Sequence, residues 1–301
     1  MHVETLQVFC DLVELQSFSL AAERNFVTQS AVSQQIRTLE EKFRKKLLER
    51  VRGRREIRLT AAGEVFYRES KNVLDAYSQL NEQMNSLVGR VSGVVKVATV
   101  YSVGLHELPP IVREFMLKFP SVKIDLEYSR TTRVVRDVLK GIVELGVVAF
   151  PEPRRGITVV PMASDRLVVI CPPDHDLAKE KTISAKQLKD QDFVLFERDI
   201  PTRKATDRIL RSYGVSVNKA AEFDNIETIK RAVEVGFGLA IVPYPSVVDE
   251  ERNGQLKVVK LKETDWERPV GVIYRSEREL TLAAQKFVKL LGANAVESVA
   301  A

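Results

Sequence analysis

A long stretch without helix-breaking residues divides this chain of 301 residues into two unequal parts. Between Thr60 and Val88 there is no proline, and Gly63 is the only glycine. Apolar residues recur there every seven positions at Phe66, Val73, Leu80 and Leu87, with Tyr77 and Met84 on the adjacent line. This spacing predicts a helix about 40 Å long with a coiled-coil seam. The seam packs either on its own chain or, as we expect between two domains, on a second subunit.

The residues before this helix have the pattern of a helix-turn-helix. An apolar stripe from Leu6 to Val13 indicates the first helix. Ser17 and Thr28 are suited to cap the second and third helices, and Asn25 suits the turn between them because asparagine tolerates a left-handed backbone. The third helix has an apolar stripe at Val32, Ile36, Leu39 and Phe43 and a polar face at Ser30, Ser33, Gln34 and Arg37. A short polar face of this kind suits a DNA major groove.

The next segment is basic and alternates like a hairpin. Between Arg37 and Arg58 there are ten Lys or Arg residues and four acids, an excess larger than the net charge of +5 of the whole chain. Leu48–Val51 and Glu56–Leu59 alternate like strands, and the loop between them carries Arg52, Arg54 and Arg55. Such a clustered charge is either a solvated surface or, on a hairpin beside a helix-turn-helix, a wing that contacts DNA phosphates or the minor groove.

The remaining two thirds of the chain alternate between strands and helices. Residues 94–149 begin with the β-branched strand Val94–Val100 and follow a βαβαβ order, which indicates a parallel sheet with right-handed crossovers. A second alternation covers residues 166–242, and residues 270–291 return to the first lobe. We therefore expect a hinged two-lobed domain, with lobe I made of about 94–162 and 269–293 and lobe II of about 163–268. The ligand is expected in the cleft between the lobes.

The polar residues expected in this cleft lie at strand ends and helix starts. Free amide groups at such positions favour anions. The candidate contacts are Tyr101, Ser102, Arg130, Thr202, Arg203 and Asn225. Two arginines near helix starts indicate a carboxylate, sulfate or phosphate effector, unless both simply lie in solvent.

Several motifs resemble those of LysR-type transcriptional regulators. They are Ser17-Phe18-Ser19-Leu20-Ala21-Ala22-Glu23, Val27 to Ile36, Leu39-Glu40, Leu59-Thr60-Ala61-Ala62-Gly63, Phe223-Asp224-Asn225 and Val235 to Pro243. The resemblance covers nearly the whole chain. It implies a winged helix-turn-helix DNA-binding domain at 1–60, a dimerising linker helix at 61–90 and an effector-binding domain at 91–301. The last of these resembles periplasmic solute-binding proteins, and the assembly implied is a homotetramer.

The same resemblance implies which residues contact promoter DNA. They are Thr28, Gln29, Ser30, Ser33 and Gln34 on the third helix, with Arg52 and Arg54 in the wing; Arg37 joins them from the polar face. Two positions depart from the family pattern: Ser30 replaces a frequent proline, and Gln34 replaces a frequent arginine. Loss of that arginine predicts a lower affinity for DNA or a weaker salt dependence.

Two other classes of function fit the sequence less well. An enzyme is disfavoured because His2, His106 and His175 lie in no metal-ligand or nucleophile motif, and no P-loop or Gly-x-Ser-x-Gly motif is present. A solute-binding receptor is disfavoured by the basic N-terminal module and the lack of an export signal. We expect no cofactor, metal or membrane span, two reduced cysteines (Cys10 and Cys171), and a cytoplasmic regulator with RNA polymerase as a further candidate partner.

Overall fold

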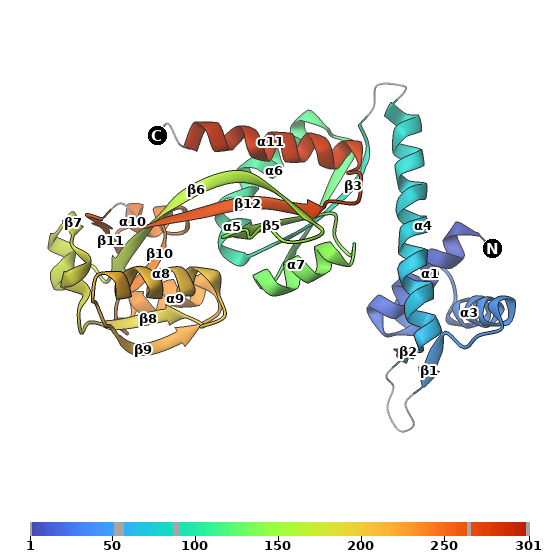
Figure 1. The fold of residues 1–301 in the computed structure, drawn as a ribbon, viewed down its shortest axis with the longest axis horizontal. Helices are drawn as coiled ribbons and strands as arrows, with labels where there is room; N and C mark the ends of the chain where they lie inside the picture. The colour runs from blue at the N-terminus through green and yellow to red at the C-terminus, as the bar shows by residue number, and fades with distance from the viewer. Residues whose placement is uncertain (1, 51–56, 87–90, 264–265, 299–301) are drawn as a thin grey trace. The chain divides into compact units, whose positions relative to one another are not determined.

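The computed structural model describes residues 2–50, 57–86, 91–263 and 266–298, and the chain divides into two compact units, Met1–Arg90 and Val91–Ala301 (Figure 1). The first unit contains α1 (Val3–Leu15), α2 (Phe18–Arg24), α3 (Gln29–Phe43), β1 (Leu48–Arg50), β2 (Ile57–Leu59) and α4 (Ala61–Ser86). Leu12, Ala21 and Ile36 come from α1, α2 and α3 and are buried in one apolar core. The unit is thus a small helical domain with a hairpin and one long helix.

Both predicted helix starts are confirmed. Ser17 Oγ accepts a hydrogen bond from the Leu20 amide, and Thr28 Oγ1 accepts one from the Ala31 amide. Each hydroxyl satisfies an amide that the first turn of a helix leaves free. The turn between α2 and α3 differs from the prediction, because Asn25 has a φ of −100° and the left-handed residue is Phe26, with a φ of 55°. The side-chain Nδ2 of Asn25 donates instead to Oδ2 of buried Asp11 (2.8 Å).

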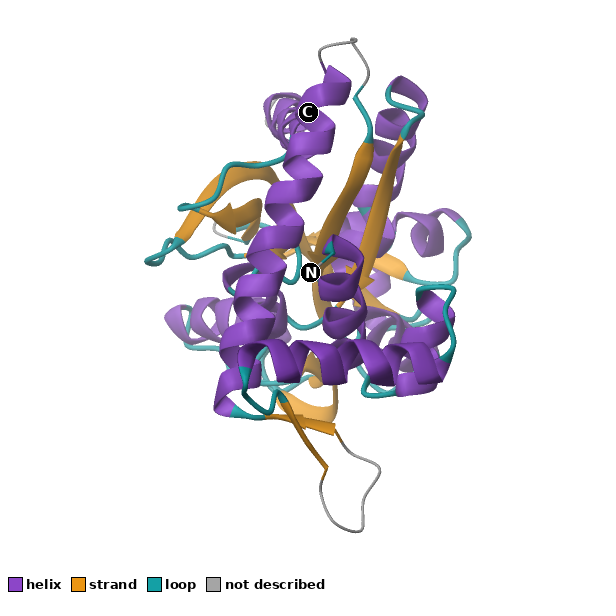
Figure 2. Ribbon diagram, turned by 90° about the vertical axis from the view of Figure 1, so that its right-hand side faces the viewer, coloured by secondary structure: helices purple, strands orange, loops and turns teal. Residues whose placement is uncertain are grey.

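The hairpin lies against the start of the long helix α4. Strands β1 and β2 pair antiparallel beside its first turn (Figure 2). The Thr60 amide donates to Leu47 O (3.0 Å), and the Thr60 hydroxyl accepts from the Gly63 amide (3.0 Å). Only glycine fits at position 63, since a β-carbon there would lie 2.0 Å from Leu47 O. The predicted wing residues Arg52 and Arg54 lie outside the described residues.

The long helix α4 confirms the predicted helix and divides its apolar seam into two parts. Near its start, Phe66 packs edge-on against Phe9 and Phe43, with ring centroids 5.0 and 5.1 Å away. Phe43 is nevertheless 42% exposed, so the predicted core stripe of α3 ends at Leu39. Farther along, the exposed fractions of the seam residues lie between 46% and 59%, at Val73, Tyr77, Leu80 and Met84. The described residues of the unit therefore leave about half of each of these side chains uncovered; Leu87 lies outside the described residues.

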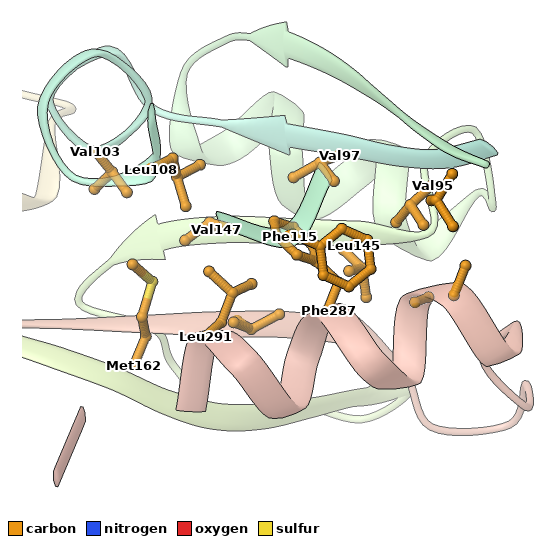
Figure 3. Packing of buried hydrophobic residues seen from close by; sticks show 14 of the residues in the cluster. Val95, Val97, Val103, Leu108, Phe115, Leu145, Val147, Met162, Phe287 and Leu291 are labelled. Carbon is orange, nitrogen blue, oxygen red and sulfur yellow. The ribbon is translucent and has the colours of Figure 1, made fainter. Parts of the chain in front are cut away.

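The second unit is an α/β fold with two lobes. Lobe I contains β3 (Gly93–Thr99), α5 (Tyr101–His106), α6 (Leu108–Lys118), β4 (Val122–Tyr128), α7 (Thr131–Leu139), β5 (Leu145–Ala149), β12 (Glu267–Arg275) and α11 (Leu282–Ser298). Strand β3 lies between β4 and β5 and is parallel to both, which confirms the predicted βαβαβ order. Because β12 joins β5 antiparallel, the sheet is mixed. On one face, Phe115 of α6 and Phe287 of α11 pack together with ring centroids 4.9 Å apart (Figure 3).

Lobe II contains a second set of strands and helices. They are β7 (Thr182–Ile183), β8 (Asp192–Phe196), α8 (Pro201–Ser212), β9 (Asn218–Phe223), α9 (Ile226–Glu234), β10 (Ala240–Pro243), α10 (Val248–Arg252) and β11 (Lys257–Leu261). Leu210 of α8 and Ile229 of α9 are buried in two separate apolar clusters, and both clusters include residues from the strands of this lobe. Over the described residues of both units, none of the helices is long and apolar enough to cross a membrane.

Strand β6 (Ile157–Cys171) belongs to both lobes. Its residues 157–166 pair with β12 in lobe I, and its residues 167–171 pair with β10 and β11 in lobe II. The chain returns to lobe I beside this point, where the Leu167 amide donates to Trp266 O (2.8 Å). The two crossings therefore lie side by side, which is the arrangement of a hinge.

A buried ionic cluster occupies this crossing. Arg268 of β12 is 1% exposed, and its Nε donates to Oδ2 of the cross-strand neighbour Asp165 (3.0 Å). Its Nη2 donates to Oε1 of Glu107 (2.5 Å), and its Nη1 donates to Ser102 Oγ (2.9 Å). One guanidinium thus faces two buried carboxylates. Oε2 of Glu107 is buried without a hydrogen-bond partner among the described residues.

This excess of buried negative charge changes the titration of Glu107. Burial raises the pKa of Glu107 to about 8, and the nearby Asp165 carboxylate opposes the lowering by Arg268. Between pH 4.5, the ordinary pKa of glutamate, and about pH 8, Glu107 therefore keeps its proton in the folded protein, whereas the unfolded chain releases it. Its contribution to the unfolding free energy is fully present below pH 4.5 and is lost as the pH rises through about 8.

We expect Glu107→Gln, which keeps the neutral form at every pH, to remove this decline in the unfolding free energy. Urea unfolding at a series of pH values, followed by the fluorescence of Trp266, the single tryptophan, measures it. Glu114→Gln, on an exposed carboxyl of α6, is the matched control and should keep the wild-type pH dependence. Parallel curves for wild type and Glu107→Gln would contradict the assignment.

Candidate functional site

The polar face of α3 is open to solvent. All the sequence-predicted contacts on this helix and its cap are exposed: Thr28, Gln29, Ser30, Ser33, Gln34 and Arg37. The opposite face is buried through Val32, Ile36 and Leu39, so the helix has one fixed orientation in its unit. Thr28 Oγ1 and Ser30 Oγ lie 2.9 Å apart, and the Arg37 Nε donates to Glu41 Oε1 (3.0 Å). Gln29, Ser33 and Gln34 present side-chain donors and acceptors outward from its first turns.

Two carboxylates join neighbouring elements of the first unit. Asp11 of α1 is 2% exposed and accepts hydrogen bonds from Asn25 and from Gln7 Nε2 (3.1 Å). Glu40 of α3 accepts from the Leu47 amide (2.9 Å) and from Lys46 Nζ (2.6 Å). Burial by itself would raise the pKa of Glu40, but these hydrogen bonds lower it. Asp11 therefore joins α1 to the C-cap of α2, and Glu40 joins α3 to the segment that leads into β1.

The second unit contains a cavity of about 260 Å³ between its lobes. Lobe I and β6 supply Val100, Tyr101, Ser102, Ser129, Arg130, Thr131, Thr132, Val135, Val148, Ala149, Phe150, Pro151, Glu152, Arg154, Ile157 and Ile273, and lobe II supplies Phe196, Asp199, Ile200, Pro201, Thr202, Lys204, Asp224 and Ile226. Most of the wall is aliphatic or aromatic. The polar groups come from the first turns of α5, α7 and α8 and from charged side chains of both lobes. First turns expose amide groups that no helix bond uses.

Four of the six predicted effector contacts line this cavity: Tyr101, Ser102, Arg130 and Thr202. Arg203 does not, which corrects the expectation for it. Its Nη1 donates to Phe196 O (2.7 Å) and Glu222 Oε1 (2.8 Å), and its Nε donates to Asp207, so the guanidinium is used within lobe II. Asn225 does not line the cavity either, because its Oδ1 caps α9 by accepting from the Glu227 amide (2.8 Å).

Arg130 links the lobes across the cavity. It follows β4 of lobe I, and its guanidinium nitrogens lie 2.8 Å from Glu197, 3.3 Å from Asp199 and 2.9 Å from Asp224, all in lobe II. The hydrogen bond to Asp224, helped by the other two carboxylates, raises the pKa of Arg130. No local sequence pattern identifies these acids as partners of Arg130, because they lie 67 to 94 residues away from it.

A histidine makes a second link between the lobes. Nε2 of His106, in α5 of lobe I, lies 2.8 Å from Oε1 of Glu227, in α9 of lobe II. The hydrogen bond to His106 and a second one from buried Lys230 (3.0 Å) lower the pKa of Glu227. Together with Arg130, this pair joins the two lobes.

The cavity can bind a small molecule that carries acceptor atoms. Ser102 Oγ accepts from Arg268, so the hydroxyl proton of Ser102 remains for another acceptor. Ser129, Thr131, Thr132 and Thr202 add hydroxyl groups to the wall. Among the described residues, no group of three or more His, Cys, Asp or Glu side chains is arranged to hold a metal ion.

Comparisons with known proteins agree with both halves of this picture. Residues 3–64 match the family model described as bacterial regulatory helix-turn-helix protein, lysR family, and residues 89–295 match that of the LysR substrate binding domain. CmpR of Synechocystis sp., an HTH-type transcriptional activator, is 29% identical over 288 residues, which cover 96% of this chain and 94% of CmpR.

Solved structures show the same fold. CbnR complexed with its target DNA matches with a TM-score of 0.70 at 22% identity, covering 98% of this chain and 100% of that one. The regulatory domain of CcmR from Synechocystis, in complex with 2-PG, matches with a TM-score of 0.62 at 24% identity, covering 67% of this chain and 97% of that one. With a helix-turn-helix at its start and a substrate-binding domain over the rest, the chain belongs to the LysR family of transcriptional regulators.

Proposed function

We propose that this regulator reads promoter DNA with the polar face of α3 and changes its DNA binding when a small anion occupies the interlobe cavity. The observation that carries the proposal is the cavity itself. Arg130 in its wall comes from one lobe, and the carboxylates that face Arg130 come from the other. A ligand that engages Arg130 must therefore rearrange contacts between the lobes, and such a rearrangement is what a signal requires.

The proposed DNA contacts are the exposed polar residues of α3. Gln29 and Gln34 carry amide groups that can bond adenine in the major groove, and Ser30 and Ser33 can bond bases or phosphates. Arg37 is partly neutralised by Glu41, which leaves it as a phosphate contact at the edge of the helix. The proposal keeps Arg52 and Arg54 as wing contacts on the basis of the sequence alone.

An anionic effector is supported by the donors around the cavity. First turns of three helices, the Ser102 hydroxyl and Arg130 all favour oxygen acceptors. The CcmR regulatory domain, which has the same fold, was solved in complex with 2-PG, and this supports a ligand site in the present domain as well. The aliphatic wall and the small volume limit the ligand to a compact molecule.

The acids around Arg130 set the condition for binding. Arg130 is paired with three carboxylates, so an anion that binds Arg130 must displace at least part of this pairing. The effector affinity is set by the difference in free energy between Arg130 paired with these carboxylates and Arg130 paired with the anion. This favours an anion that makes a bidentate contact with Arg130 and adds hydrogen bonds to the hydroxyl groups. Removal of the carboxylates from Arg130 would also free lobe II to move.

The proposal extends to assembly and location. The exposed seam at Val73, Tyr77, Leu80 and Met84 supports dimerisation through α4, and we propose a homotetramer built from such dimers. Because its target is chromosomal DNA, the proposal locates the regulator in the cytoplasm, where RNA polymerase is available as a partner. The cavity is proposed to bind its ligand without chemical turnover, so an enzyme and a transport receptor are the less favoured alternatives.

For DNA binding, we expect Gln29→Ala to weaken specific recognition about tenfold, since a good amide–base pair contributes about 1–3 kcal/mol of discrimination. Fluorescence anisotropy across a salt series, on a duplex selected from random sequence by the wild-type protein and on a scrambled duplex, measures this. The salt slope should stay unchanged because no phosphate contact is lost. Gln285→Ala, in the other unit, is the control. Equal binding of the selected duplex by wild type and Gln29→Ala would contradict the assignment of Gln29 as a base contact.

For the effector, we expect Arg130→Gln to weaken binding about tenfold or more, since a hydrogen bond to a charged group contributes about 1.5–3 kcal/mol. A thermal-shift screen of small phosphates and carboxylates first identifies the anion that most stabilises wild type, and calorimetry then compares the variants. Arg252→Gln, on an exposed arginine of α10 outside the cavity, should bind as wild type does. Full affinity in Arg130→Gln would place the anion elsewhere.

A further inference from the structure

Phe26 occupies a position where the backbone favours glycine. It follows the C-cap residue of α2, and the hydrogen bonds from the Val27 amide to Ala22 O (3.0 Å) and from the Phe26 amide to Glu23 O (3.2 Å) close the turn. This pair of bonds defines a Schellman motif, whose left-handed residue is usually glycine. Phe26 takes that position with a φ of 55°, a conformation that residues with a β-carbon avoid.

The side chain of Phe26 is not buried against the rest of the fold. Phe26 is 96% exposed, the highest exposure among the large apolar residues that the structure describes. An aromatic ring in this position costs backbone strain and leaves its apolar surface in water. Violations of local rules without a packing gain point to a role in function.

Phe26 lies beside the polar residues of α3 that we propose to contact DNA. It begins a run of five consecutive exposed residues, 26–30, which contains Thr28, Gln29 and Ser30 of the DNA-reading face. Val27 beside it is 37% exposed, and Leu20 of α2 is 49% exposed. The first residues of a recognition helix are those that approach base edges in the major groove. A rigid apolar side chain two residues before the helix cap is therefore carried to the rim of that groove.

We propose that Phe26 is a specificity-determining residue that packs against the methyl group of a thymine in the major groove. This inference rests on the proposed use of α3 in reading DNA. The thymine methyl is the one apolar group that base edges present in this groove, and apolar side chains, phenylalanine included, contact it. The strained turn serves the contact, because its hydrogen bonds hold Phe26 at a fixed distance before Gln29.

The main variant is Phe26→Gly, which removes the ring and relieves the left-handed backbone. We expect it to raise the urea midpoint of unfolding of the first unit, measured by circular dichroism, while it weakens binding to the selected duplex about tenfold. A loss of folding therefore cannot explain the weaker binding. Phe26→Tyr retains the ring and should bind nearly as wild type does.

A second measurement identifies the group that Phe26 contacts. Each thymine of the selected duplex is replaced in turn by deoxyuridine, which lacks only the methyl group, and the affinity of wild type and Phe26→Gly is measured by anisotropy. We expect one or two replacements to weaken wild type roughly fourfold per methyl lost and to leave Phe26→Gly unaffected. The salt slope of both proteins should be equal.

The outcomes separate this inference from the proposed function. If wild type selects no duplex, the DNA-reading role of α3 fails first. If wild type selects a duplex and Phe26→Gly binds it equally well, Phe26 makes no DNA contact and the inference is wrong. If binding falls but wild type and Phe26→Gly respond alike to every thymine replacement, the ring contacts another part of the DNA or a partner protein, and the thymine readout is overturned.

Discussion

The pairing of β6 with β12 is the constraint on which the second unit depends. These strands pair over their length in lobe I, and β6 continues into lobe II, where it pairs with β10 and β11. Both passages between the lobes therefore lie next to each other, and the lobes can move about this line while each keeps its own core. Arg268 lies at the same place and joins Asp165 of β6 to Glu107 and Ser102 of lobe I. A contact made to Ser102 inside the cavity is thus one hydrogen bond away from the hinge.

The charges around the cavity follow from this arrangement. At one end of the interface the lobes are held by Arg130 with its three carboxylates, and His106 and Glu227 form a further link. Pairs as exposed as Arg130 contribute little to stability on their own. They define one arrangement of the two lobes, which the proposed anion can replace at low cost. A cavity lined only by arginines would bind anions more tightly but would have no competing state.

The sequence predicted the features that depend on neighbouring residues. The caps at Ser17 and Thr28, the long helix α4 and the βαβαβ order follow from patterns within a few turns of chain, and the structure confirms them. Four cavity residues, including Ser102 and Arg130, were found because strand ends in a parallel sheet share one edge. Arg203 was misjudged, since its position near a helix start gave no sign of Glu222 and Asp207 as partners.

Other features depended on contacts that no local pattern records. Arg268 lies 166 residues from Ser102, and the partners of Arg130 come from two separate loops of lobe II. The turn before α3 was assigned to Asn25 by residue preference, but buried Asp11 takes the Asn25 amide and leaves the left-handed position to Phe26. Residue preference alone therefore did not locate the left-handed residue of this turn.

The central claim is that the cavity and the DNA-reading face influence each other. The most direct measurement is the affinity of the protein for its selected duplex with and without the stabilising anion, together with the affinity for the anion with and without the duplex. Thermodynamic linkage requires the two ratios to be equal, and the account predicts that both differ clearly from one. Tight binding of both ligands with both ratios equal to one would contradict it, because the cavity would then carry no signal to DNA.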